Sequence, residues 1–145
     1  MELDFDRSKT LEELEGVVWG EPTDPSNLVL TVYGLRKKPL QEFSAEDLRV
    51  VIGQHLFLPF VIPLALELLE KDLMVSDYPY QEGVLLEYVA QVEPRFWREH
   101  PDMKDRFESL LERELASNFT YRERIDAASN AYRRFRRLLR ATDRN

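Results

Sequence analysis

Side chains suited to catalysis are few in this sequence, and they lie far apart. Its two histidines are His55 and His100, neither stands in a metal-binding HExxH pattern, and there is no cysteine. The glycine-rich loops that bind phosphates and the GxSxG turn of serine hydrolases are also missing. Carboxylate pairs such as Glu12 and Glu13 are common, but among 27 acidic residues most belong to solvated helix faces. The sequence therefore predicts no enzyme, no catalytic residue, no metal ion and no cofactor.

Charge is unevenly distributed along the chain. Residues 1–30 hold eight acidic and two basic residues, and residues 66–93 hold seven and one. Residues 121–145 instead hold eight arginines and three acidic residues, although the net charge of the chain is −7. Such a protein lacks the overall positive field that nonspecific binding to nucleic acids requires. Its acidic zones suit a basic protein partner, because complementary charge speeds encounter and fixes the register of binding.

The arginine-rich end, YRRFRRLLRATDRN, leaves a second interpretation open. Arginines alternate there with aromatic residues, as in surfaces that bind single-stranded nucleic acids, so a small helical nucleic-acid-binding regulator is the alternative function. However, Tyr132, Phe135 and Leu139 fall at helical spacing on one apolar stripe. This spacing predicts that the rings belong to the core and that the arginines pair with acidic segments. We therefore expect a protein partner and no nucleic acid.

Short amphipathic helices separated by prolines account for most of the chain. In the second helix, Leu28, Val32 and Leu35 recur at helical spacing until Lys38 and Pro39. Alternation typical of a strand is confined to VVW at residues 17–19, where a small hairpin is the main alternative. The sequence thus predicts an all-α fold. Capping residues and prolines place the helix starts near Ser8 or Thr10, Asp24, Ser44, Pro59, Val84, Pro94, Pro101 and Tyr121.

The stretch LFLPFVIPLALELL, residues 56–69, is the most apolar part of the chain. It is too short to span a membrane, which takes roughly 20 apolar residues. Pro59 fits the first turn of a helix over about 58–71. Because this helix is apolar on nearly every side, other helices must surround it. The residues expected to be almost fully buried are Val61, Leu64, Ala65, Leu68 and Leu69.

The length and composition suit one domain over residues 1–145, since 43% of the residues are hydrophobic and two cores would be too small. The predicted architecture is a compact bundle of six to eight short helices around the central apolar helix at 58–71. The N-terminus is acidic and is not followed by an apolar export segment, and cysteine is absent. These features predict a cytoplasmic protein.

Ordered blocks of the sequence resemble the immunity proteins of bacterial contact-dependent growth inhibition (CDI) systems, the CdiI type. The blocks are LEELEG (11–16), WGEP (19–22), LRKKPL (35–40), EDLRVVIGQ (46–54), PLALELLEKD (63–72) and SDYPYQEGVLLEYV (76–89). Together they cover roughly residues 9–100. The chain departs from the family pattern after Asp72, where a proline is expected, and after Pro79, where Gly-Asp-Leu-Leu is expected. Both departures fall in a segment suited to partner contact, so they concern which toxin is recognised.

The resemblance implies a protein that binds and neutralises the C-terminal toxin domain, often a nuclease, of a CdiA-type exoprotein, with one copy of each. From the residues themselves, the predicted contact surface is the acidic segment 72–87. Tyrosines offer large rigid contact area, and carboxylates bind arginine or lysine in a basic cleft. The acidic segment from Glu2 to Glu21 is the second candidate. The predicted partner-binding residues are Asp72, Asp77, Tyr78, Tyr80, Glu82 and Glu87.

Overall fold

The computed structural model describes residues 5–23, 26–76, 82–117 and 122–143, and every element in these ranges is a helix. The all-α prediction is confirmed. The alternative of a hairpin at residues 17–19 is wrong, because the carbonyl of Val17 accepts a hydrogen bond from the side chain of Arg36 and not from a neighbouring strand. The elements are α1 (Leu11–Glu15), α2 (Asn27–Leu35), the short 3-10 helix η1 (Leu40–Glu42), α3 (Ala45–Gly53), α4 (Leu58–Lys71), α5 (Val84–Ala90), α6 (Pro94–Glu99), α7 (Pro101–Ala116) and α8 (Arg122–Asp143).

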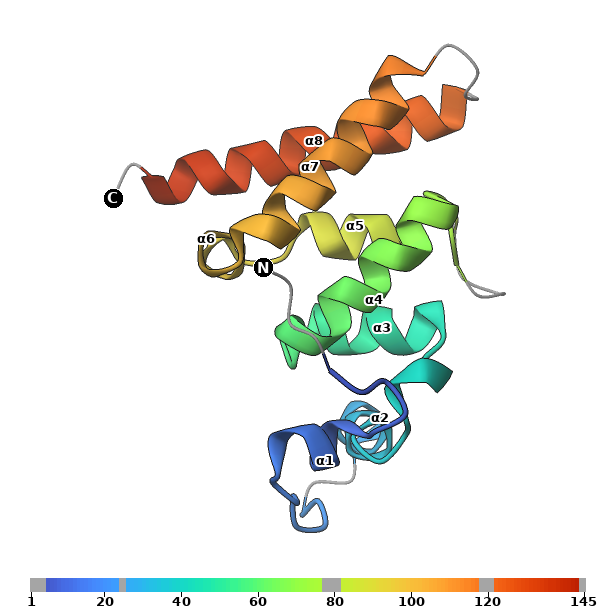
Figure 1. Ribbon diagram of the computed structural model, residues 1–145, viewed down its shortest axis with the longest axis vertical. Helices are drawn as coiled ribbons and strands as arrows, with labels where there is room; N and C mark the ends of the chain where they lie inside the picture. The colour runs from blue at the N-terminus through green and yellow to red at the C-terminus, as the bar shows by residue number, and fades with distance from the viewer. Residues whose placement is uncertain (1–4, 24–25, 77–81, 118–121, 144–145) are drawn as a thin grey trace.

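The helices are arranged in three groups along the long axis of the molecule (Figure 1). Helices α7 and α8 pack against each other at one end, and α1 and α2 lie at the opposite end. Between them, α3 packs on both α4 and α5. Helix α4 also contacts α7, and α5 also contacts α8, so these two helices connect the middle group to the C-terminal pair.

Capping residues define the beginnings of α1 and α3. The hydroxyls of Thr10 and Ser44 each accept the backbone N–H three residues later, from Glu13 and Asp47 respectively. The two carboxylates accept the backbone N–H of the capping residue in return, which completes a capping box. Gly16 ends α1 in the left-handed conformation, at a φ of 70°, where glycine is favoured. These boundaries agree with the sequence prediction.

Helix α2 begins later than predicted, and its first half is exposed. Its N-cap is Ser26, whose hydroxyl accepts a first-turn backbone N–H at 3.3 Å, while the predicted start at Asp24 lies outside the described residues. Val32 and Leu35 are buried, whereas Leu28 is 45% exposed. The residues of its first turn are exposed, and its buried residues lie in its second half.

Helix α4 forms over the predicted residues and is the centre of the core. Pro59 lies in its first turn, where the missing N–H has no helical partner to lose. Neither α4 nor any other helix in the described ranges is long and apolar enough to cross a membrane. Leu68 is only half-buried, so the prediction of its full burial is wrong, whereas Leu66 is completely buried. The other predicted core positions are confirmed as buried: Val61, Leu64, Ala65 and Leu69.

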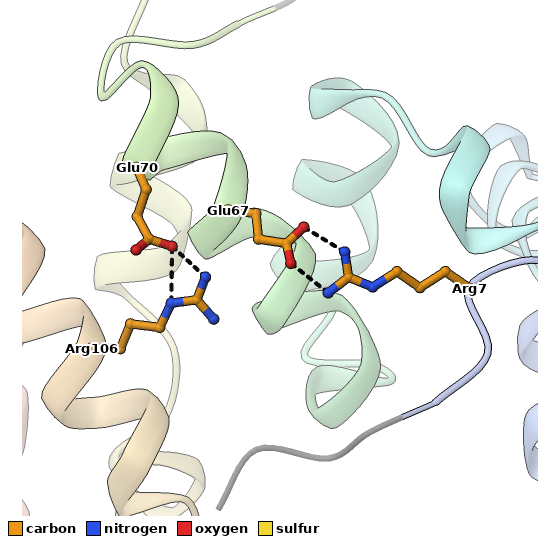
Figure 2. A network of polar contacts seen from close by, with 4 residues as sticks. All are labelled: Arg7, Glu67, Glu70 and Arg106. Atoms are coloured by element: carbon orange, nitrogen blue, oxygen red, sulfur yellow. Dashed lines mark hydrogen bonds and ion pairs between the residues drawn. The ribbon is translucent and has the colours of Figure 1, made fainter.

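Two carboxylates of α4 bind arginines from distant segments of the chain (Figure 2). Glu67 forms a bidentate ion pair with Arg7 of the N-terminal segment, and both N–O distances are 2.5 Å. Glu70 accepts a hydrogen bond from Nε of Arg106 in α7 at 2.9 Å. The two pairs hold the N-terminal segment and α7 against opposite flanks of α4.

We predict different losses of stability for two leucines of α4. Leu66→Ala is expected to lower the free energy of unfolding by about 2–5 kcal/mol, because its buried side chain leaves a cavity. Leu68→Ala removes the same atoms and should cost less, because water already reaches part of this side chain. Urea denaturation measures both values. Equal losses of unfolding free energy would contradict the orientation of α4, in which Leu66 faces the core and Leu68 is partly exposed.

The Arg7–Glu67 pair predicts a specific pH dependence. Hydrogen bonding to Arg7 lowers the pKa of Glu67 below its ordinary value of 4.5. A carboxylate with a lowered pKa stabilises the folded state above its ordinary pKa, and this stabilisation is lost as the pH falls through the lowered pKa. Glu67→Gln should therefore reduce the free energy of unfolding at about pH 7, with an effect that shrinks below pH 4.5.

A double-mutant cycle with Arg7→Gln isolates the contribution of this pair. In the Arg7→Gln background, the effect of Glu67→Gln should vary less between about pH 7 and pH 3, because the hydrogen bond to Arg7 is the largest cause of the lowered pKa of Glu67. Denaturant unfolding of the four proteins at each pH gives the coupling free energy. A coupling that is the same at both pH values would show that the ion pair does not cause the pH dependence.

Candidate functional site

Three of the six predicted contact residues are in the described ranges, and all three are exposed. Asp72 follows the last turn of α4, and its Oδ1 accepts the backbone N–H of Met74 at 3.1 Å. Glu82 precedes α5, and Glu87 lies in the first turn of that helix. The other three predicted residues lie outside the described residues: Asp77, Tyr78 and Tyr80.

A backbone hydrogen bond joins the segment that follows Asp72 to the residue that follows Glu82. The N–H of Gly83 donates to the carbonyl of Met74 at 3.1 Å, which brings the end of α4 close to the beginning of α5. Gly83 has a φ of 82°, a conformation that favours glycine. A side chain at this position would also come within 3.3 Å of the methyl group of Met74. The carboxylates of Asp72 and Glu82 are therefore presented from positions that the fold determines.

A groove of about 550 Å³ runs between α5 and α8. Carboxylates from the α5 side and guanidinium groups from α8 line it together: Glu82, Glu87, Arg133, Arg134 and Arg137. Its lining includes buried apolar residues of both helices: Leu86, Ala90 and Ala131. The fold thus brings two of the predicted acidic residues to the same groove as the basic helix. Asp72 is not part of this groove.

The aromatic residues of α8 contribute to the core, as the sequence predicted. Phe135 is 1% exposed, and its ring meets those of Trp97 and Phe107 edge-on at 5.5 and 5.2 Å. Tyr132 also packs against the core. The rings that the alternative function would need for stacking on bases are therefore turned inward. Two of the arginines pair with acidic residues of α7, namely Arg124 with Glu114 and Arg136 with Glu108.

The two histidines, which are distant in sequence, lie along the same shallow depression of about 240 Å³, together with Glu93 and Glu99. The ring of His100 packs against that of Phe96, with 4.6 Å between centroids. In the described part of the chain, no three His, Cys, Asp or Glu side chains are grouped so that they could hold a metal ion.

The structure also exposes an apolar surface that the sequence analysis did not identify. Among the described residues, seven large hydrophobic side chains are exposed, and six of them come from α2 and from the segment after α1. The sequence did contain a signal: VVW follows the Gly16 that ends α1, and LVL opens α2, where only one helix face can be buried. We call this surface the apolar end, and it consists of Val17, Val18, Trp19, Leu28, Val29 and Leu30.

Comparison of the chain with known proteins identifies its family. No curated protein and no solved structure matches it significantly. A family described as CDI immunity proteins does match, over residues 13–107, which is about two thirds of the chain. The matched range runs from α1 into α7 and contains α4, the segment 72–87 and the apolar end, while α8 lies outside it. The chain therefore belongs to the family of CDI immunity proteins.

Proposed function

We propose that this protein binds and neutralises the C-terminal toxin domain of a CdiA-type exoprotein. The complex contains one copy of each protein and forms in the cytoplasm of the producing cell. The observation that carries this proposal is the match to the CDI immunity family over residues 13–107. Membership of this family implies a toxin as the protein partner. Inhibition by binding requires a preformed surface and no chemical step, and the helices packed around α4 supply the necessary rigidity.

We further propose that the toxin is a nuclease, on the basis of charge. A nuclease must bind a polyanion, so its substrate cleft carries lysine and arginine side chains. The immunity protein has a net charge of −7 and exposes carboxylates at Asp72, Glu82 and Glu87. Such carboxylates form charge-assisted hydrogen bonds with the same basic groups that bind phosphates. An acidic inhibitor therefore competes with the nucleic acid for the cleft.

In this proposal the segment 72–87 contacts the toxin through the six residues predicted from the sequence. Asp72 and Glu82 have exposed side chains at positions that the hydrogen bond between Met74 and Gly83 holds together. Exposed carboxylates act mainly on the rate of association, because their field reaches about 8 Å into solution at physiological salt. They contribute less to the lifetime of the complex, which depends on desolvated contacts.

Coproduction with the toxin domain tests the proposed function. The chain should restore growth to cells inhibited by the C-terminal domain of the CdiA-type exoprotein encoded beside it. The purified pair should form one complex with the mass of one copy of each protein, measured by light scattering. Adding an equimolar amount of the chain should stop RNA or DNA degradation by the toxin domain. Continued growth arrest without complex formation would contradict the function, whereas a free toxin domain that degrades neither nucleic acid would contradict only the nuclease assignment.

We predict that the acidic residues of the segment 72–87 accelerate toxin binding. The triple variant Asp72→Asn, Glu82→Gln, Glu87→Gln should associate with the toxin domain roughly tenfold more slowly at low salt. The difference from the parent protein should shrink as salt is added, because ions screen exposed charges. Stopped-flow mixing at several salt concentrations measures both effects. Identical association rates at low salt would place the toxin contact on another surface.

The double variant Arg134→Gln, Arg137→Gln is the matched control, because both arginines line the groove that also contains Glu82 and Glu87. It removes two positive charges from the groove, whereas the triple variant removes negative ones. If the arginines serve folding and solubility, this variant should protect cells as the parent does and remain about equally stable, within roughly 1 kcal/mol. Lost protection without lost stability would assign the toxin contact to α8. Salt-dependent RNA binding by the parent, abolished in this variant, would instead support the regulatory alternative.

A further inference from the structure

The apolar end is the part of the described structure where the rule of buried hydrophobic residues fails most clearly. Val18 is 76% exposed, Val17 is 51% exposed, and Leu28 and Leu30 are nearly half exposed. The segment containing the two valines and the first turn of α2 lie at the same end of the molecule, away from α7 and α8 (Figure 1). Isolated exposed hydrophobic residues are ordinary, but a group of them on one region marks a surface that another molecule covers.

A buried arginine holds this exposed segment in place. Arg36 is 1% exposed, and its guanidinium donates to the carboxylate of Glu15 and to the carbonyl of Val17, the latter at 2.5 Å. The same group lies 4.1 Å from the centroid of the Trp19 ring and 5.1 Å from that of Phe57. Four groups around one cation therefore fix the path of residues 15–19 against the beginning of α4.

The backbone of Arg36 contributes to the same arrangement, since its carbonyl accepts the N–H of Glu12 at 3.1 Å. One residue thus holds both ends of α1. Removing a guanidinium from water costs several kcal/mol unless its hydrogen bonds and ion pair offset the cost. Here these bonds do not serve to bury the neighbouring valines, which remain in solvent. Their effect is to present Val17 and Val18 in a fixed conformation, and such preorganisation reduces the entropy lost when a partner binds.

Carboxylates lie close to the apolar end along the chain and determine what kind of partner suits it. Glu13 and Glu21 are exposed, and Glu12 is half-buried. The charges of Glu12 and Glu21 reach Lys37, whose pKa is raised mainly by its hydrogen bond to Tyr33 and further by these two carboxylates. The guanidinium of Arg36 is internal and already paired. The apolar residues are therefore bordered by an excess of negative charge, which complements a basic surface.

We propose that the apolar end is the main anchor for the toxin domain, and that it binds a toxin surface with an apolar centre and a rim of lysine or arginine. This inference rests on the proposed function. Protein interfaces concentrate their binding energy in a few central, desolvated residues, among which tryptophan is enriched, and surround them with a polar rim. Trp19 with its neighbouring valines and carboxylates has this composition. The anchor determines the rate of dissociation, while the exposed carboxylates of the segment 72–87 act on association.

The double variant Val18→Ser, Leu28→Ser tests the anchor. Neither side chain is buried, so the circular dichroism spectrum and the melting temperature should stay those of the parent. The complex with the toxin domain should dissociate at least about tenfold faster, with an association rate within about twofold of the parent, as measured by surface plasmon resonance. Leu115→Ser is the matched control, because it removes an exposed leucine from α7 at the other end of the molecule and should change neither rate.

Arg36→Met tests the positioning role of the buried arginine through the toxin complex and through hydrogen exchange. In the parent, toxin binding should slow amide exchange within residues 15–30. In the variant, the free protein should exchange faster at residues 15–19, and the toxin should dissociate faster. If this variant does not fold, the two serine substitutions still decide the question.

The outcomes separate the anchor from the proposed function. If the parent binds the toxin domain and the serine variant dissociates at the same rate, the anchor proposal is overturned while the function stands. If the parent fails to bind, both are overturned. If the serine variant converts a dimer of this chain into a monomer in analytical ultracentrifugation and leaves toxin dissociation unchanged, the apolar end is covered by a second copy. That result also overturns the proposal.

Discussion

The apolar surface of α4 has to be shielded from water on nearly every side, and no single neighbouring helix can do this. Helices α3, α5 and α7 therefore pack around it, and α5 in turn reaches α8. Each buried leucine of α4 contributes about 1.5–3 kcal/mol relative to an exposed one, so the arrangement of the other helices follows from this requirement. The polar side of α4 is the exception, and there Glu67 and Glu70 bind arginines that attach the N-terminal segment and α7.

A core built in this way leaves the surface free to carry recognition. Specificity within a family that neutralises toxins can change through exposed side chains while the buried ones keep the fold. The segment 72–87 and the apolar end act through different physical interactions. The segment 72–87 offers exposed carboxylates, whose field is long-ranged but screened by salt. The apolar end offers hydrophobic side chains that act only on contact, and the internal guanidinium of Arg36 fixes their backbone.

Local features of the sequence were sufficient for most of the secondary structure. The capping boxes at Thr10 and Ser44, the extent of α4 and the inward orientation of Phe135 all depend on residues within one or two helical turns. Spacing in the sequence records such relations directly, because side chains three or four residues apart share a helix face. The blocks of sequence that resemble the CDI immunity proteins were sufficient to identify the family, because their order along the chain can be read without knowledge of the fold.

What only the tertiary structure decided is which of the apolar faces are covered. The all-round apolarity of α4 predicted full burial for Leu68, but the packing leaves this residue half-buried and leaves the first turn of α2 exposed. Nothing in the sequence near Arg36 distinguished it from the exposed arginines, because its partners Glu15, Val17 and Trp19 lie about twenty residues earlier in the chain. Burial is a property of the contacts between helices. The sequence by itself therefore determined the helices and the family, and the packing of those helices determined which residues remain available for a partner.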